Sequence, residues 1–222
     1  DEVIVTGVDG NEQAVQMIKD GSCLKATVKQ NFEGMADIVC QQMEKYYAGI
    51  GSRSTPKEVL NLFESLGRYL ATCNFILRSG AADGADSAFE RGCDKFLGRK
   101  EIYLPWKEFN NSNSKLIVKD PEAFKIAANY HPNWKRLSDG AKKLQARNTH
   151  QVLGWNLHTP SEFIVCYTKN GKRSGGTGQA LRLAEAYHIP IFDVGAYASI
   201  NEFRLDFWNY LRTNYADLLE KE

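Results

Sequence analysis

Short runs of β-branched and aromatic residues alternate along the chain with longer stretches whose apolar positions recur every three or four residues. The first kind of pattern predicts strands and the second predicts amphipathic helices. The predicted strands are residues 3–5, 24–28, 46–50, 75–77, 101–104, 163–166 and 190–194. The predicted helices are residues 11–20, 32–43, a helix that starts near 56 and carries apolar positions to 70, one that ends near 96, 121–130, 138–153, 179–187 and 199–213. This alternation is typical of the α/β class.

Residues 105–140 interrupt the alternation of predicted strands and helices. This stretch contains Pro105, Pro121 and Pro132 together with several asparagines, so we interpret it as an insertion with one helix near 121–130. Elsewhere the strand-to-helix connections are short and contain glycine. Such connections indicate a mostly parallel sheet with a site at the carboxyl ends of its strands.

Composition narrows the functional classes. With 222 residues, the chain has room for one large domain, or for one domain and a smaller piece. Its 28 basic and 27 acidic residues give a net charge of +1, which disfavours a protein that mainly coats nucleic acid or an anionic membrane. No apolar run approaches the ~18 residues that a membrane span needs, so we expect no membrane partner.

The five cysteines are widely spaced and form no CxxC pair. Neither a disulfide framework nor a structural zinc site is indicated, and the four histidines show no shared metal spacing. We therefore expect a reduced, cytoplasmic protein with no metal and no resident cofactor.

Three predicted strand-to-helix turns carry more small and polar residues than a simple turn requires: residues 49–55, 78–86 and 174–179. Glycine allows a ligand to approach the backbone, and the following helix directs unpaired N–H groups and a partial positive charge at it. Together these features favour an anion, most often phosphate. Arg53 adds a guanidinium fork suited to the same chemistry. Taken alone, each turn is explained equally well as a tight strand-to-helix connection that binds no ligand. The presence of three such turns on one sheet favours a ligand site.

None of the turns has the Gly-Lys-Ser/Thr ending of a P-loop or the GxGxxG spacing of a dinucleotide site. Generic kinases, ATPases and dinucleotide oxidoreductases are therefore disfavoured. We expect Asp83 or Asp86 to accept hydrogen bonds from a ribose or a base. The candidate ligand-binding residues are Gly49, Gly51, Ser52, Arg53, Ser79, Gly80, Asp83, Gly84, Asp86, Gly175, Gly176, Thr177, Gly178 and Gln179.

Four motifs together indicate a family resemblance. They are residues 46–53 with Thr55-Pro56, residues 78–86, His131-Pro132 followed by residues 146–148 and 151–154, and residues 174–179. From about Met43 to Asn214 the chain resembles the SLOG superfamily of Rossmann-like nucleotide-binding proteins. The most similar branches are DNA-processing protein A (Smf) and the phage-type recombination mediators. The motifs are specific to the superfamily but not to one reaction.

The resemblance implies a Rossmann-like, mostly parallel sheet flanked by helices, with a pocket at the carboxyl ends of its strands. In the family such pockets take nucleotides, nucleotide-derived signals or single-stranded DNA. Arg147 and Asn148 match a family motif and are further candidates for the pocket. Because many members of the superfamily pair through helices, the resemblance also implies a homodimer.

One departure from the family's motifs disfavours an enzymatic function. The branch similar to the Lonely Guy phosphoribohydrolases carries Gly-Gly-x-Gly-Thr-x-x-Glu in its late glycine loop. Here Arg182 stands at the glutamate position, and Glu185 lies three residues further on. A carboxylate is the group that would stabilise a ribosyl cation or activate water, so its replacement disfavours hydrolysis. Arg182 is kept as a further candidate ligand residue.

Residues 1–42 form a separate βαβα extension in this interpretation, before a nucleotide-binding domain over 43–222. The extension resembles a stretch near the C-terminus of type I periplasmic sugar-binding proteins, in which Asp9 and Gln30 would match sugar-binding positions. Such a cleft needs two whole lobes, so sugar binding is disfavoured. Two alternatives remain: the extension adds two strands to the same sheet, or Met43 marks the start of a protein to which it was fused.

The function predicted from the sequence is binding of a nucleotide or another phosphorylated small molecule at the edge of the sheet. Three alternatives stay open. They are single-stranded DNA binding of the recombination-mediator type, hydrolysis of a nucleotide N-glycosidic bond, and an engineered chimera without a selected function.

Overall fold

The computed structural model describes residues 44–173 and 175–219. The strands and helices predicted before residue 44 lie outside the described residues, and so does Ser174. The proposed βαβα extension, its likeness to sugar-binding proteins and the boundary near Met43 therefore stay predictions.

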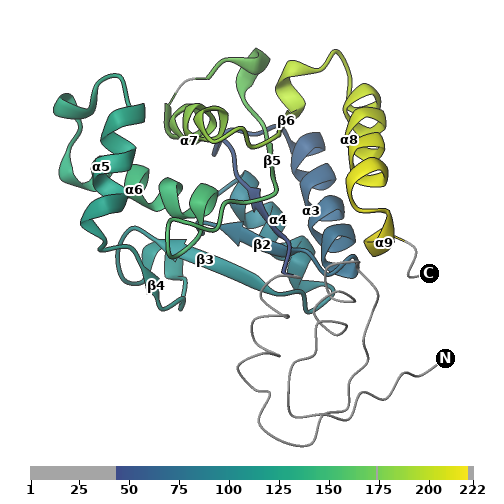
Figure 1. Cartoon of the computed structure of the whole chain (residues 1–222), viewed down its shortest axis with the longest axis horizontal. Helices are drawn as coiled ribbons and strands as arrows, with labels where there is room; N and C mark the ends of the chain where they lie inside the picture. Colours follow the sequence, from purple (N-terminus) through teal and green to yellow (C-terminus); the bar gives the residue numbers. More distant parts are fainter. Residues whose placement is uncertain (1–43, 174, 220–222) are drawn as a thin grey trace, which may run out of the picture. The chain divides into compact units, whose positions relative to one another are not determined.

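The described residues contain one sheet of six strands, and all five pairings between neighbours are parallel. The spatial order is β4-β3-β2-β1-β5-β6 (Figure 1). The strands are β1 (Tyr46–Gly49), β2 (Ile76–Ser79), β3 (Lys100–Leu104), β4 (Leu116–Ile117), β5 (Phe163–Cys166) and β6 (Ile191–Asp193). The predicted α/β class and parallel sheet are confirmed. Strand β4 was not expected, because its two residues lie inside the proline- and asparagine-rich insertion.

Helices connect these strands. They are α3 (Lys57–Thr72), α4 (Ala85–Asp94), α5 (Pro121–Tyr130), α6 (Asp139–Leu153), α7 (Gly175–Ala186), α8 (Ile200–Asn214) and α9 (Ala216–Leu219). Short 3₁₀ turns are η1 (Phe109–Asn111), η2 (Trp134–Arg136), η3 (Lys169–Gly171) and η4 (Val194–Ala196). Three of the α-helices begin at a residue whose side chain accepts a backbone N–H bond: Asp120 from Glu122, Ser138 from Ala141 and Ser199 from Glu202. Such caps supply acceptors for amides that have none inside the helix.

Helix α7 corrects the sequence prediction. The run after β5 was expected to be a glycine-rich loop with a helix from 179, but the helix already begins at Gly175. Gly175 has a φ of 63°, a left-handed conformation that glycine adopts without strain, so this glycine suits the start of the helix. The third glycine-rich run is therefore mostly the first turn of α7.

Apolar side chains alternate along the central strands and fill two cores. Tyr47 and Phe163 point to the side covered by α3, α4 and α8, where they join buried Phe63, Phe89 and Phe207. Their neighbours Ala48 and Ile164 point to the side covered by α5, α6 and α7. Figure 1 shows α3 and α8 on one side of the sheet and α5, α6 and α7 on the other. Strands buried on both faces are characteristic of parallel sheets.

The strand order places a topological switch point between β1 and β5. The chain leaves β1 towards α3 in one core and leaves the adjacent β5 towards α7 in the other. The connections after these two strands therefore diverge to opposite faces. In open α/β sheets, ligands bind in the crevice that this divergence creates.

None of the helices in the described ranges combines the length and the apolar character that crossing a bilayer requires.

Candidate functional site

A cavity of about 430 Å³ lies at the carboxyl ends of β1, β2 and β5, at the switch point. Residues from all three predicted turns contribute to it, and α6 supplies one further wall. Its lining consists of Ile50, Gly51, Ser52, Arg53, Ala82, Asp86, Leu144, Gln145, Arg147, Asn148, Gln151, Thr168, Lys172, Gly175, Gly176, Thr177 and Ala180. The three stretches of chain that were singled out in the sequence therefore do converge on one concave place.

The turn after β1 contributes Gly51, Ser52 and Arg53. It is held in shape by its own hydrogen bonds, since the Ser52 carbonyl accepts from the N–H and the hydroxyl of Thr55 at 3.3 and 2.7 Å. Arg53 is exposed and makes no hydrogen bond or ion pair with any residue that the structure describes. Its guanidinium is therefore available to a ligand. Gly49 of β1 does not reach the cavity, because it packs against the ring of Phe89.

The turn after β2 contributes less than the sequence suggested. Only Ala82 and Asp86 line the cavity. Ser79 is buried and donates to Glu90 at 2.7 Å, while Asp83 is exposed outside the lining. Gly84 has φ of 87° and lies so close to the first turn that a Cβ would be 2.7 Å from the Ser52 carbonyl oxygen. Gly84 therefore packs the two turns against each other, and Ser79 and Asp83 are outside the lining of the cavity.

Asp86 and Arg147 form a buried ion pair in the cavity wall, with 3.4 Å between Nη1 and Oδ2. The same Nη1 donates to the Gly80 carbonyl, while the Gly80 N–H donates to Asp86 at 3.1 Å. Burial raises the pKa of the Asp86 carboxyl, and the charge of Arg147 opposes that rise. Burial also lowers the pKa of the Arg147 guanidinium. Its Nε is buried without a partner among the described residues.

The first turn of α7 contributes Gly175, Gly176 and Thr177. A Cβ at Gly175 would meet no heavy atom within 4 Å, so the backbone there is open. The next two candidates lie outside the lining. A Cβ at Gly178 would lie 2.3 Å from the Arg173 carbonyl oxygen, and Gln179 is fully buried with neither amide atom bonded to a described residue.

Arg182 is also outside the lining. Its Nε donates to the Tyr130 carbonyl at 2.8 Å and its Nη1 to the Arg173 carbonyl at 3.3 Å. The residue at the expected glutamate position thus joins α7 to the end of α5. It does not contact the cavity.

Eight lining residues were not among the candidates: Ile50 and Ala82 within the predicted turns, and Leu144, Gln145, Gln151, Thr168, Lys172 and Ala180 outside them. The three on α6 share a helix face with Asn148, because residues three and four apart lie one above the other. That spacing, next to the Arg147-Asn148 motif, could have identified them. Lys172 stands three residues before a glycine run in a strand-to-helix connection, which is the place where an anion-binding cation is expected.

The charges of the lining favour an anion. Lys172, like Arg53, makes no ion pair with any described residue and is exposed. Asp86 is the one acidic residue in the lining, and Arg147 compensates its charge. Two uncompensated cations and the amino end of α7 therefore face the same space.

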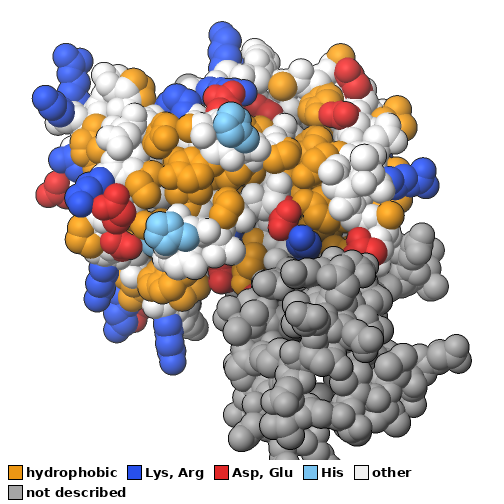
Figure 2. All heavy atoms as spheres, in the orientation of Figure 1, with side chains coloured by type: hydrophobic (Ala, Val, Ile, Leu, Met, Phe, Trp, Pro, Cys, Tyr) orange, Lys and Arg blue, Asp and Glu red, His pale blue; other side chains and the backbone are white. Residues whose placement is uncertain are grey.

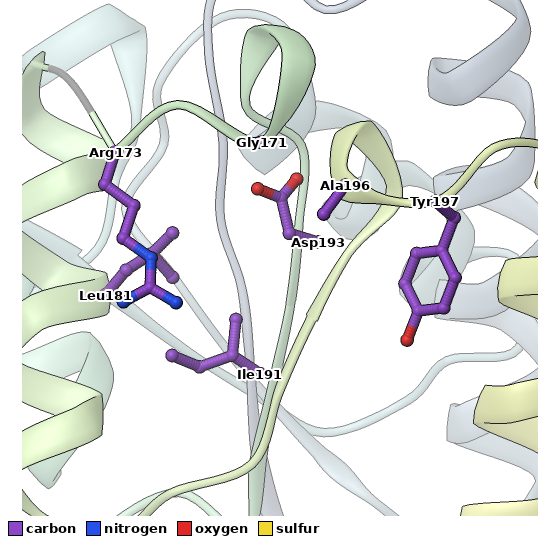
Figure 3. A pocket seen from close by; sticks show the side chains of 7 residues that line it. All are labelled: Gly171, Arg173, Leu181, Ile191, Asp193, Ala196 and Tyr197. Carbon is purple, nitrogen blue, oxygen red and sulfur yellow. The ribbon is translucent and has the colours of Figure 1, made fainter.

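A smaller hollow of about 180 Å³ lies on the other side of the β5–α7 connection, beside β6. In Figure 3 the Arg173 side chain extends over it and the Asp193 carboxylate points towards the connection at Gly171. Arg173 is ion-paired with Glu185. Asp193 accepts from the N–H groups of Thr168 and Gly195 at 2.8 and 3.0 Å and from the Thr168 hydroxyl. These groups are occupied within the protein, and Asp193 fixes the connection that carries Thr168 and Lys172 into the larger cavity.

Within the described ranges, no three His, Cys, Asp or Glu side chains gather in a way that could hold a metal ion.

No protein-family model matches this sequence, and no curated protein matches it. Among solved structures, the chain is similar to DNA processing protein A from Helicobacter pylori, which was described for its single-stranded DNA binding mode. The identity is 18% over 79% of this chain and 82% of that chain, with a TM-score of 0.49.

DNA processing protein A from Streptococcus pneumoniae is 18% identical over 78% of this chain, with a TM-score of 0.45, and this chain spans 57% of its length. The Moco carrier protein of Chlamydomonas is 16% identical over 79% of this chain and 86% of that chain, with a TM-score of 0.43. Two of these three structures are DNA-processing proteins A, the group that the sequence motifs resemble. At these identities the likeness extends no further.

Proposed function

We propose that this protein binds a phosphorylated small molecule, of the nucleotide class, in the cavity at the switch point between β1 and β5. The observation that carries the proposal is the presence of two uncompensated cations, Arg53 and Lys172, around an open helix start at Gly175. A phosphate group needs several hydrogen-bond donors and positive charge, and helix starts and guanidinium groups supply both.

The remaining lining suits the rest of such a molecule. Ile50, Leu144 and Ala180 provide apolar surface, while α6 contributes carboxamides. A volume of about 430 Å³ lies in the usual range for small-molecule sites. Ligand sites commonly combine apolar walls with a few placed polar groups.

Binding is favoured over hydrolysis by the state of Asp86. Asp86 is buried in the wall, and its Oδ2 accepts from Gly80, Arg147 and Gln151, so the protein itself holds this carboxylate. A general base or a group that stabilises a cation must be free to face the substrate. Release of free base from a nucleoside monophosphate by the purified protein would contradict this part of the proposal.

Single-stranded DNA is the second candidate partner from the sequence. On the face seen in Figure 2, the Lys and Arg side chains are spread around the rim and interspersed with Asp and Glu. A strand-binding groove instead tracks the backbone with a run of positive charge. The two partners differ in salt dependence, because a strand that neutralises several phosphates loses affinity with a slope of about −0.7 per phosphate in a double-logarithmic plot.

The proposal is tested by isothermal titration calorimetry with nucleoside monophosphates and, separately, a single-stranded oligonucleotide at two salt concentrations. Replacing Arg53 or Lys172 by alanine removes a charge-assisted bond and should weaken nucleotide binding about tenfold. Lys169→Ala and Arg204→Ala are matched controls, because both are exposed cations without a described ion pair outside the cavity. Wild-type protein that binds no nucleotide at millimolar concentration would overturn the proposal.

A further inference from the structure

Helix α6 carries an unusual buried segment. Seven consecutive residues, 145–151, are each less than 9% exposed, and six of them are polar or charged. Burying a polar side chain costs free energy unless its hydrogen bonds are replaced. The hydrogen bonds of the carboxamides in this segment therefore show which of their atoms bind the protein and which are left for a ligand.

The orientation of two amides is fixed by partners that can only accept. Nδ2 of Asn148 donates to the Gly176 carbonyl at 3.1 Å, and Nε2 of Gln151 donates to the Asp86 carboxylate at 3.4 Å. A backbone carbonyl offers no proton, and Oδ2 of Asp86 already accepts from the Gly80 N–H and from Arg147, so the NH₂ end of each amide must face the protein. Nδ2 of Asn148 also donates to Oε1 of Gln145 at 3.4 Å, which orients the third amide.

Three hydrogen-bonding atoms are left over. They are Nε2 of Gln145, a donor, and Oδ1 of Asn148 and Oε1 of Gln151, both acceptors. None has a hydrogen-bond partner among the described residues. All three residues line the cavity. Along α6 the wall therefore offers a donor, an acceptor and a second acceptor.

The complementary ligand edge is an acceptor followed by two donors. A ring carbonyl next to a ring N–H supplies the first two groups, and an exocyclic amino group supplies the third. Guanine and pterins carry this 2-amino-4-oxopyrimidine edge, and hypoxanthine carries the first two groups only. Adenine presents the reverse order, with an amino donor beside a ring-nitrogen acceptor. A site whose polar groups would be left unpaired discriminates strongly against the wrong ligand.

We propose that the ligand of this cavity carries a 2-amino-4-oxopyrimidine edge, recognised by Gln145, Asn148 and Gln151. The inference rests on the proposed function, since the phosphate site brings the ligand into the cavity. It adds that the amide face of α6 selects the heterocycle.

The test is a calorimetric titration of the full chain with five probes: GMP, IMP, AMP, neopterin phosphate and ribose 5-phosphate. GMP or neopterin phosphate should bind at least tenfold more tightly than AMP, with IMP between them and ribose 5-phosphate close to AMP. A preference for neopterin phosphate over GMP identifies the source of the edge as a pterin, and the opposite preference identifies it as guanine.

Two variants distinguish a loss of base recognition from a general loss of ligand affinity. Gln145→Glu turns the free donor into an acceptor, so the ratio of GMP affinity to AMP affinity should fall by at least tenfold. The added negative charge weakens the binding of both monophosphates equally, so it cancels in this ratio. Gln145→Met should bring that ratio towards one and leave ribose 5-phosphate unchanged. Asn61→Ala, at an exposed position of α3, should keep the wild-type ratio, and circular dichroism reports whether each variant is folded.

Equal binding of GMP and AMP by the wild type would overturn the inference, while ribose 5-phosphate binding that depends on Arg53 would leave the phosphate site standing. Equal losses for all five probes in Gln145→Met would make Gln145 a phosphate ligand and would also overturn it. Failure of every probe to bind would overturn both this inference and the proposed function.

Discussion

The guanidinium of Arg147 occupies the space beside Gly80 where any larger residue would place its side chain. A Cβ built on Gly80 would lie 1.4 Å from Nη1 of Arg147 and 2.3 Å from its Cζ. Arg147 is 5% exposed and paired with Asp86, so it has little freedom to move away. Residues from the turn after β2 and from α6 are thus fitted to each other beneath the cavity.

Replacing Gly80 by alanine should therefore destabilise the fold. Overpacking a buried position costs about 1–3 kcal/mol, which corresponds to a clear fall in the melting temperature. Gly140→Ala is the matched control, because a Cβ at Gly140 in α6 meets nothing within 4 Å and alanine is the better helix former. A Gly80→Ala protein as stable as the wild type would show that the Arg147 side chain is not confined there.

Removing the charge of Arg147 should be more damaging than removing the whole ion pair. Arg147→Met leaves Asp86 buried and uncompensated, which typically costs about 3–5 kcal/mol. The double variant Arg147→Met/Asp86→Asn removes both charges and should recover part of that loss. Urea unfolding of the two single variants and the double variant gives the coupling. Strictly additive effects would contradict a direct interaction.

Glu90 makes stability depend on pH. Burial raises the pKa of its carboxyl, although hydrogen bonds from Ser79 and Ala81 act in the opposite direction. The folded protein therefore binds this proton more tightly than the unfolded chain. The stability gained in this way is complete below the ordinary glutamate pKa of about 4.3 and is lost as the pH rises through the raised value.

Glu90→Gln keeps an oxygen that can accept from Ser79 and Ala81 but carries no charge to bury. Its melting temperature relative to the wild type should therefore increase as the pH is raised from about 4 to 8. Glu58→Gln, at an exposed position of α3 without a described ion pair, serves as the control in the same thermal scans. A constant difference across this range would refute the assignment.

Asp193 should affect ligand binding without touching the ligand. Its carboxylate accepts three hydrogen bonds that fix Thr168 and Gly195. Asp193→Ala removes all three, which should cost about 2–4 kcal/mol at the usual worth of about 0.5–1.5 kcal/mol each, and should release the connection that carries Lys172. Nucleotide affinity in this variant should fall several-fold in calorimetry at a temperature where the protein remains folded. Unchanged affinity would show that the connection keeps its shape without this carboxylate.

Most strands of the sheet were predictable from the sequence because the central strands are buried on both faces and are therefore apolar throughout. Phe163–Cys166, for example, is an uninterrupted apolar run, and the predicted strand has the observed bounds. Two-residue β4 was missed although Leu116, Ile117 and Val118 form a short apolar run, because that run lies inside the proline- and asparagine-rich insertion. Helix α7 was predicted to start late because its glycines were interpreted as a loop, whereas Gly175 supplies the left-handed φ with which the helix begins.

The cavity was predictable only in part. Arg53 and the glycines at 175 and 176 stood out because three glycine-containing turns coincide in the sequence, although each turn alone has an ordinary backbone explanation. Ser79 and Gly84 have the same residue types, but they face protein, which only the packing of one turn on another decides. The carboxamides of α6 come from a part of the chain distant from all three turns, so their approach depends on the tertiary fold.

The central claim is that a phosphate group binds among Arg53, Lys172 and the first turn of α7. The most direct measurement is a two-dimensional amide NMR titration of the protein with ribose 5-phosphate, which isolates the phosphate from any base. The account predicts the largest shifts at the amides of residues 51–53 and 175–178, and their loss in Arg53→Ala. Shifts centred on another part of the molecule, such as α8, or no shifts at saturating ligand, would contradict it.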